Sequence, residues 1–361
     1  MRFAPPNPLR IADRASGLNA PTVRSYNERL VLSLLLQSSG ISRLEIGEKT
    51  GLSAQTVSVI VRSLEQEGLV SKGEAQRGRV GPPTIPLSLN PTGAFSVGVS
   101  FRDRAVDVVL IDFVGQVRHH QAHPYPASRE GCGWIASKIE HALRTLPPGS
   151  TNRVAGIGLA VPGDTDTNHR AKDVLGPDIA GAQAELEGRI GLPIYIQNEI
   201  TAAAGGESLF GIARPLADFL FFYLGSRLHS RLILNYQIHS GRSDPSHDVG
   251  LAQLYARLSE RGLPQDVLDH DPWSKSADDV VSEWDRAFNR TIVNSTESLL
   301  GFVNFKSVVI SSYAPPVLGI ALCNHLRETL PELDFRWGAV SSAPKAVGAA
   351  SLPYHSRFMV Q

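Results

Sequence analysis

Polar residues between positions 53 and 62 carry side chains suited to reading DNA. If this segment is a helix, one face is apolar and the other presents Gln55, Ser58 and Arg62. A glutamine can form paired hydrogen bonds with an adenine edge, and serine and arginine can contact bases or phosphates. We therefore predict base contact by Gln55 and base or phosphate contact by Ser58 and Arg62. The full set of predicted DNA-binding residues on this helix is Ser53, Gln55, Thr56, Ser58 and Arg62.

The elements around this segment have the pattern of a helix-turn-helix. Apolar residues recur at helical spacing over 30–35. A second helix begins after Ser42, because Ser42 and Glu45 have the spacing of a capping box, and it ends at Gly51. The third helix follows almost at once and covers about 53–67. Two helices joined by so tight a turn predict a DNA-binding motif, with a generic helical hairpin as the alternative.

A loop rich in glycine and arginine follows the third helix and has the layout of a wing. It separates two strand-like segments, 69–70 and 84–89, and it carries Arg77 and Arg79. Arginines on such a loop can contact phosphates or enter a narrow minor groove, where the negative potential is enhanced. We predict that both arginines bind DNA, with a solvated hairpin tip as the alternative. The expected domain is a winged helix-turn-helix over 25–90, preceded by a flexible arm over 1–24.

The composition is typical of a soluble protein with two or three domains. The chain has 361 residues, of which 42% are hydrophobic and 19% charged, and its net charge is zero. Residues 1–89 carry 11 Lys and Arg against 7 Asp and Glu, so an excess of positive charge lies on the predicted DNA-binding part. The N-terminus has no apolar signal segment, and the most apolar stretch, 216–224, is too short to span a bilayer. We therefore expect a cytoplasmic protein.

Neither the cysteines nor the histidines have the spacing of a metal site. Cys132 and Cys323 lie far apart, so a disulfide framework and a four-cysteine site are both excluded. His119, His120 and His123 are close in sequence, but no carboxylate or cysteine stands at ligand spacing from them. We therefore predict surface histidines and no bound metal.

Residues 91–361 have the pattern of an internally duplicated α/β domain. Two strand-rich halves are each followed by helices. The expected strands are 95–101, 105–113, 154–161, 193–197, 218–224, 232–238 and 308–311. The expected helices are 133–146, 182–190, 251–262, 276–301 and 316–329.

The chain resembles transcriptional regulators of the ROK family, whose name stands for repressors, open reading frames and kinases. The resemblance covers nearly all of the chain after residue 26. It rests on GISRLEIGEKTGLSAQTVSVIVRSLEQEGLV at 40–70, GPPTIPLSLNPTGAFSVGVS at 81–100, GIGLAVPG at 156–163, LEGRIGLPIYIQNEITAAAGGE at 186–207 and AVGAAS at 346–351. It implies an α/β fold in which the winged helix-turn-helix precedes a two-lobed, actin-like (RNase H-like) ROK domain with a sugar site in its cleft. It also implies a homodimer or homotetramer, which would bind double-stranded DNA at an inverted-repeat operator.

Three glycine-rich turns that hold the nucleotide in kinases of this family have no counterpart here. The resembling segments are Ser-Phe-Arg-Asp-Arg at 100–104, Gly-Ser-Arg-Leu-His at 225–229 and Ser-Ser-Tyr at 311–313. Side chains in these turns take the space that backbone N–H groups need to approach a phosphate. The cysteine cluster of the family's zinc site is also absent. We therefore predict no enzyme activity, no cofactor and no zinc.

The resemblance also implies four sugar-contacting residues. Asn198 and Glu199 match an Asn-Asp pair whose Asp is the catalytic base of the kinases, and Asp248 and Gln253 match two sugar-contacting glutamates. The alternative for Asn198 and Glu199 is a pair that ends a strand and caps the next helix, 201–207.

Together these features predict a DNA-binding transcriptional repressor that responds to a sugar or sugar derivative. Two alternatives remain at this point. One is an active ATP-dependent sugar kinase, and the other is a dimerisation scaffold that carries a DNA-binding module and binds no ligand.

Overall fold

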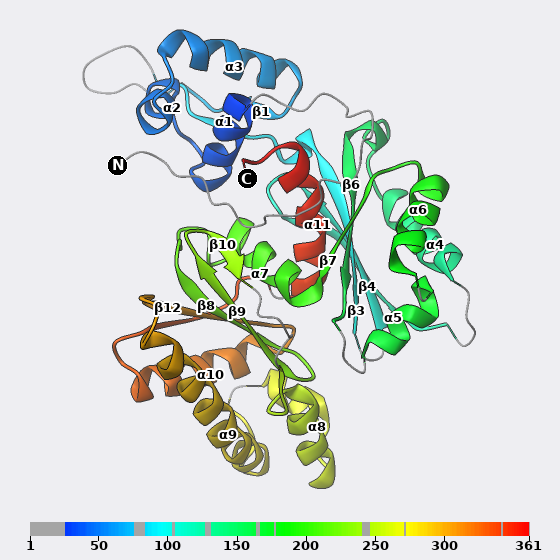
Figure 1. The fold of residues 1–361 in the computed structure, drawn as a ribbon, viewed down its shortest axis with the longest axis vertical. Coiled ribbons are helices and arrows are strands. Elements are labelled where there is room, and N and C mark those ends of the chain that lie inside the picture. The colour runs from blue at the N-terminus through cyan, green and yellow to red at the C-terminus, as the bar shows by residue number, and fades with distance from the viewer. Residues whose placement is uncertain are drawn as a thin grey trace.

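The computed structural model describes residues 26–75, 84–102, 105–126, 131–163, 167–176, 178–239, 246–270, 272–340 and 342–360. These residues form a small N-terminal part, at the top of Figure 1, a first lobe at the right and a second lobe at the lower left. The expected arm, the wing residues Arg77 and Arg79, and Asp103 and Arg104 lie outside the described residues.

The N-terminal part has the elements of a winged helix-turn-helix, as predicted. They are α1 (Tyr26–Gln37), α2 (Arg43–Thr50), α3 (Ala54–Gln66), β1 (Val70–Lys72) and β2 (Leu87–Leu89), with β1 and β2 antiparallel. The hydroxyl of Ser42 accepts the N–H of Glu45, and the Glu45 carboxylate accepts the N–H of Ser42, so the capping box before α2 is complete. Gly51 ends α2 in the left-handed conformation with φ 78°, which turns the chain toward α3.

The first lobe is a five-stranded sheet with helices on both faces. Its strands are β3 (Phe95–Phe101), β4 (Ala105–Asp112), β5 (Val117–Pro124), β6 (Val154–Val161) and β7 (Ile194–Asn198), in the order β5-β4-β3-β6-β7. Helices α4 (Cys132–Leu143), α5 (Thr167–Leu175) and α6 (Ile179–Ile190) cover one face. Their apolar residues, among them Ile135, Ile139 and Leu186, form a core with β3, β4 and β6.

The second lobe is built on another sheet, in the order β10-β9-β8-β12-β13. Its strands are β8 (Phe219–Leu224), β9 (Leu228–Leu234), β10 (Gln237–His239), β12 (Ser307–Ser312) and β13 (Asp334–Trp337), and the short β11 (Ser246–His247) also pairs with β9. The helices that pack with it are α8 (Leu251–Glu260), α9 (Lys275–Leu300) and α10 (Pro316–Thr329). None of the described helices is both long and apolar enough to cross a lipid bilayer.

The two sheets repeat one topology, which confirms the predicted internal duplication. In each, the first strand lies at the centre, antiparallel to the second and parallel to the fourth. The predicted single strand 232–238 is wrong: Asn235 and Tyr236 have positive φ angles of 50° and 63° and turn the chain from β9 into β10. Strands β5 and β13 and the C-terminal helix α11 (Pro344–Arg357) were not predicted from the sequence.

Helix α11 and helix α7 (Glu199–Leu209) lie at the centre of the molecule (Figure 1). Helix α11 packs across β3 and β6 on the sheet face opposite α4, and it also packs against α7. This close approach requires glycine, because a Cβ atom on Gly98 or on Gly158 would lie within 2 Å of a backbone oxygen of α11. The apolar, glycine-containing segment 346–351 thus lets a helix rest directly on the sheet.

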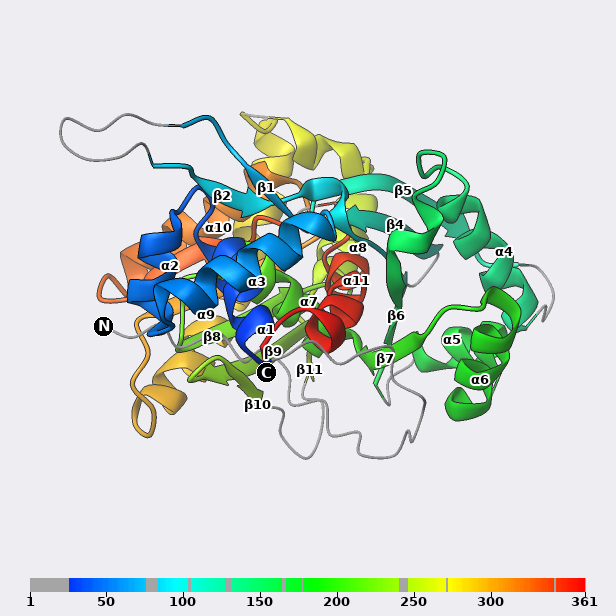
Figure 2. The ribbon, with the colours of Figure 1, turned by 90° about the horizontal axis from the view of Figure 1, so that it is seen from above.

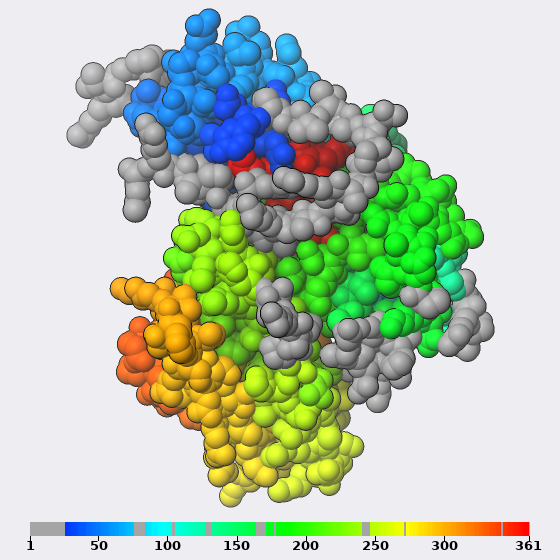
Figure 3. Space-filling model, viewed as in Figure 1, coloured from blue at the N-terminus to red at the C-terminus, as the bar shows by residue number. Residues whose placement is uncertain are grey.

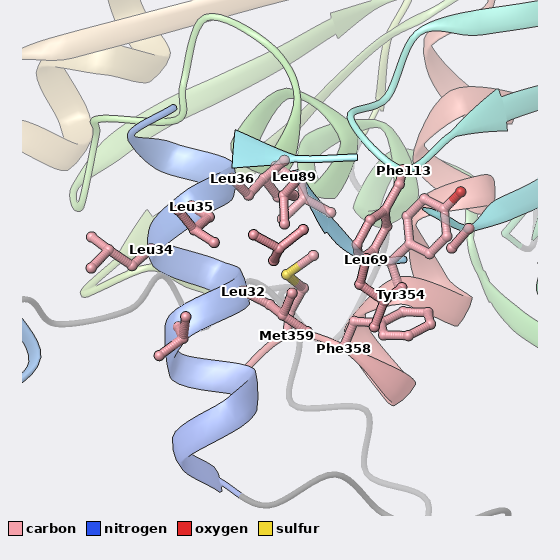
Figure 4. Packing of buried hydrophobic residues seen from close by; sticks show 14 of the residues in the cluster. Leu32, Leu34, Leu35, Leu36, Leu69, Leu89, Phe113, Tyr354, Phe358 and Met359 are labelled. Carbon is pink, nitrogen blue, oxygen red and sulfur yellow. The ribbon is translucent and has the colours of Figure 1, made fainter. Parts of the chain in front are cut away.

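The N-terminal part and the end of α11 share one hydrophobic core. Leu32, Leu35 and Leu36 of α1 belong to the same cluster as Tyr354, Phe358 and Met359 (Figure 4). Phe113 stacks edge-on against the rings of Tyr354 and Phe358. The N-terminal part is therefore docked onto the larger domain by apolar packing rather than joined to it by the linker alone.

Candidate nucleic-acid interface and ligand cleft

The outer face of α3 presents two of the side chains predicted to read DNA. Helix α3 lies at the surface of the N-terminal part, on the side away from the two lobes (Figures 1, 2 and 3). Its inner residues Val57, Val61 and Leu64 are fully buried. Gln55 and Arg62 are exposed on the opposite face. The helix therefore packs through one side and leaves the other accessible to a partner.

Ser53 and Thr56 organise the first turn of α3. The Ser53 hydroxyl accepts the N–H of Thr56 at 3.2 Å, and the two hydroxyl oxygens lie 2.8 Å apart. Ser53 is exposed, whereas Thr56 and Ser58 are half-buried. Contact of these three residues with DNA stays a prediction.

Arg62 presents an exposed positive charge on α3. Glu65, three residues after Arg62, lies 2.8 Å from Lys72 of β1 and 3.4 Å from Arg43 of α2. This acidic group is therefore neutralised by two cations. Within the described part of the chain, Arg62 has no carboxylate partner of its own. A phosphate near Arg62 would thus meet uncompensated positive charge.

Asn198, at the end of β7, is the N-cap of α7. Its side-chain oxygen accepts the N–H groups of Ile200 and Thr201 at 3.0 and 3.2 Å. The same oxygen accepts a hydrogen bond of 2.7 Å from the guanidinium group of Arg231 on β9. The helix-capping interpretation is confirmed for Asn198, whereas Glu199 is the first residue of α7, which begins there and not at Thr201. Because Arg231 belongs to the second lobe, this contact also joins the two lobes.

Glu199 forms a buried ion pair that was not predicted from the sequence. Its carboxylate lies 2.6 Å from the ammonium group of Lys345, and each side chain is only 8% exposed. Lys345 also donates to the backbone oxygen of Phe101 at 2.9 Å and lies 5.6 Å from the ring centre of Tyr223. Burial raises the pKa of Tyr223 well above its usual value, so the phenol stays neutral. The one clue in the sequence was a lysine directly before the apolar segment 346–351.

Arg102 connects two of the segments that resemble nucleotide-binding turns. It follows β3 and forms an ion pair with Asp107 of β4, with an Nη2–Oδ1 distance of 2.8 Å. Its guanidinium carbon lies 5.6 Å from the ring centre of Tyr313, which follows β12 in the second lobe. The Arg102 side chain of the first lobe thus contacts Tyr313 of the second lobe.

Asp248 and Gln253 have other neighbours than Asn198 and Glu199. Asp248 is 78% exposed and forms an ion pair with Arg227, which follows β8. Gln253 lines a surface pocket of about 440 Å³ between α8 and α9. Among the described residues, no hydrogen bond or ion pair joins Asp248 or Gln253 to Asn198 or Glu199. Asp248 and Gln253 therefore lie in other surroundings than Asn198 and Glu199, and sugar contact by all four residues stays a prediction.

The expected surface position is wrong for one of the three histidines. His123 on β5 is only 8% exposed and packs edge-on against Trp134 of α4. Burial is the main cause that lowers the pKa of His123, and the charge of Lys138 adds to it. The residues that the structure describes contain no group of three histidine, cysteine or acidic side chains that could hold a metal ion.

The fold and these contacts define a class of protein: a winged helix-turn-helix docked on a duplicated, two-lobed α/β domain. Residues 24–71 match the sequence profile "Winged helix-turn-helix DNA-binding", and residues 97–256 match the profile "ROK family". The chain thus combines a winged helix-turn-helix segment with a segment that matches the ROK family, as the resemblance to transcriptional regulators of that family predicts.

Known repressors and transcriptional regulators are similar to the chain over much of its length. A xylose repressor of Bacillus spizizenii is 29% identical over 63% of this chain and 60% of its own length. A transcriptional regulator of Mycobacterium tuberculosis is 26% identical over 57% of this chain and 48% of its own length. The alignments thus span about half to three fifths of these relatives. A solved ROK family transcriptional regulator, described as a homologue of the Escherichia coli MLC protein, shares the fold with a TM-score of 0.62 and 17% identity over 91% of this chain and 95% of its own.

Proposed function

We propose that this protein is a transcriptional repressor that binds a specific DNA sequence through α3 and responds to a sugar or sugar derivative. The exposed face of α3 carries the proposal, because Gln55 and Arg62 lie on it opposite a fully buried apolar face. Arg43 and Lys72 both pair with Glu65, which leaves the exposed charge of Arg62 available to a phosphate. The xylose repressors and transcriptional regulators to which the chain is similar support the same function.

The proposed binding unit is a homodimer or a dimer of dimers on an inverted repeat. A two-fold axis would present two copies of α3 to major grooves about one helical turn apart, or a multiple of that. Arg77 and Arg79 of the wing would add contacts to phosphates or to the minor groove. A protein bound to the chromosome of a bacterium would act in the cytoplasm.

We propose that the effector binds in the cleft beside Asn198 and Glu199. The oxygen of Asn198 is used by α7 and Arg231, and Glu199 is held by Lys345. A sugar hydroxyl that bonds to Glu199 must therefore share the carboxylate with Lys345 or displace it. Asp248 and Gln253 carry less weight as contacts, because each has a different environment.

Helix α11 offers a path from the cleft to the DNA-binding part. Lys345 lies in its first turn, and at its other end the guanidinium group of Arg29 on α1 donates to the backbone oxygens of His355, at 2.9 Å, and Met359. The hydroxyl of Ser33 accepts the N–H of Val360 at 3.0 Å. A helix of 14 residues spans about 20 Å, so α11 connects the two contacts directly. A ligand that separates Lys345 from Glu199 would therefore act on the position of α1.

Sugar kinase activity is not part of the proposal. Phosphoryl transfer depends on backbone donors and a metal that cradle the phosphates. Here the Arg102 side chain lies over Tyr313, and Glu199 is paired with Lys345 and so is not free to accept a hydroxyl proton.

The test has two stages. DNA bound by the protein in its own genome is isolated and sequenced, and an inverted repeat near genes of sugar metabolism is expected. The purified protein is then titrated with a panel of sugars that includes xylose, and its melting temperature is measured, because a ligand that binds the folded state raises it. If the protein shows no preferred DNA sequence, the proposal that it is a transcriptional regulator is wrong.

The ligand-free scaffold remains the second candidate, and the internal Glu199–Lys345 ion pair favours it. A cleft whose carboxylate is already neutralised can be stable without a ligand. If specific DNA binding is found but no sugar or sugar phosphate changes the melting temperature or the DNA affinity, the scaffold is the better description.

A further inference from the structure

Val59 is an apolar residue in the middle of the proposed DNA-reading face. It is 64% exposed, whereas its neighbours Ile60 and Val61 are buried. It lies four residues after Gln55 and three before Arg62, and side chains at these spacings are neighbours on a helix surface. The apolar side chain thus stands between two polar ones on the same exposed strip.

Packing within the protein does not account for this valine. The residues of α3 in the hydrophobic core are Val57, Ile60, Val61 and Leu64, and Val59 is not among them. A β-branched residue also has a lower helix propensity than alanine or a long polar residue. Single exposed apolar residues are common on protein surfaces. What distinguishes Val59 from such residues is its position between Gln55 and Arg62.

The major groove offers one apolar group for such a side chain. Of the four bases, only thymine carries a methyl group, at C5, and it faces the major groove. A valine that covers this methyl removes apolar surface of both groups from water. Cytosine at the same position presents no methyl group, so the contact distinguishes the two pyrimidines.

We infer that Val59 reads the C5-methyl group of one thymine in each operator half-site, next to the base contacted by Gln55. This inference rests on the proposed function, because it requires that α3 enters the major groove. It adds a specificity-determining residue that polar contacts alone would not reveal.

The test removes the methyl group and the valine separately and together. An operator is first obtained by in vitro selection with the wild-type protein. Each thymine of a half-site is then replaced with deoxyuridine, which differs only in lacking that methyl group. We expect one position at which the replacement weakens wild-type binding by roughly three- to tenfold. Val59→Ala should weaken binding to the thymine operator and should lose part of the sensitivity to deoxyuridine, because alanine covers less of the thymine methyl group than valine does.

Val117→Ala is the matched control, since it makes the same change at an exposed position on β5. It should keep the full sensitivity to deoxyuridine. Because Val59 is outside the core and alanine is the better helix former, Val59→Ala should not lower the melting temperature and should raise it slightly. If Val59→Ala is as sensitive to deoxyuridine as the wild type, or if no thymine in the half-site is sensitive, the inference is wrong while the regulator proposal stands. If the wild type selects no sequence at all, the regulator proposal fails and the inference fails with it.

Discussion

The ammonium group of Lys345 lies 2.6 Å from the carboxylate of Glu199, and both side chains are buried. The two residues are 146 positions apart in the chain and come from α11 and α7, the two central helices. In this arrangement the carboxylate at the predicted position of a catalytic base is neutralised by the protein itself. The same lysine begins the helix whose far end contacts α1 of the DNA-binding part.

Removing one partner of this ion pair should destabilise the protein strongly. Lys345→Met or Glu199→Gln alone leaves a buried polar group without its partner, and we expect each to lower the free energy of unfolding by about 3–5 kcal/mol. The double variant leaves no buried charge and should recover most of the loss. Urea unfolding of the four proteins gives the coupling, and strictly additive losses would show that the ion pair does not form in solution.

The protein should not consume ATP with any hexose or N-acetylhexosamine. The guanidinium group of Arg102 lies over the ring of Tyr313. The resemblance implies that in the family's kinases backbone N–H groups of these segments approach the phosphates of ATP. A coupled assay over a sugar panel measures turnover, with Glu199→Ala as the control. Sugar-dependent turnover that disappears in Glu199→Ala would make the protein an enzyme.

Gln55→Ala should relax base preference at one position of each half-site. Loss of a bidentate contact with adenine costs roughly 1–3 kcal/mol of discrimination against the other bases. The measurement is in vitro selection followed by affinity determination on single-base variants. Gln66→Ala is the matched control, because Gln66 is an exposed glutamine at the C-terminal end of the same helix. Unchanged preference in Gln55→Ala would exclude Gln55 from base reading.

Replacing Arg77 and Arg79 together with alanine should weaken binding to all DNA sequences and reduce its salt dependence. Each phosphate contact that is lost removes about one unit from the slope of log affinity against log salt. The Arg144→Ala, Arg189→Ala protein removes the same charge from exposed sites in the first lobe and should keep the slope. If the wing does not contact DNA, both variants should have the same DNA affinity and the same salt dependence.

Mild acid should weaken the junction between α11 and the DNA-binding part. Burial, together with the charge of Arg29, lowers the pKa of His355 to about 3. The unfolded chain takes up a proton at this histidine below about pH 6.5, whereas the folded protein does not, so stability falls as the pH drops from there toward 3.

The expected loss from His355 approaches about 1.4 kcal/mol per pH unit well below pH 6.5. His355→Gln removes this contribution, so its stability should fall less steeply between about pH 6 and about pH 4. His239→Gln is the control at an exposed histidine. Urea unfolding across this range checks the prediction, and equal slopes for His355→Gln and the wild type would contradict it.

Short-range patterns were sufficient for most of the helices and strands. The capping box at Ser42, the left-handed Gly51 and the apolar face of α3 are each set by residues within a few positions of one another, so they can be read from the chain. The bounds of β6 and α10 were predicted to the residue for the same reason. The hairpin at Asn235 and Tyr236 was missed because neither residue is a glycine, the usual sign of a positive φ angle.

The partners of charged groups were decided by the tertiary structure. Lys345 reaches Glu199 because Gly98 and Gly158 allow α11 to lie directly on the first sheet. Arg29 reaches the end of α11 across more than 300 residues of chain. Such contacts depend on how the helices pack and not on any local spacing, since burial in one core selects them. The sequence by itself therefore determined helix α3 and the duplicated domain, and only the fold determined that the carboxylate of Glu199 is held by Lys345.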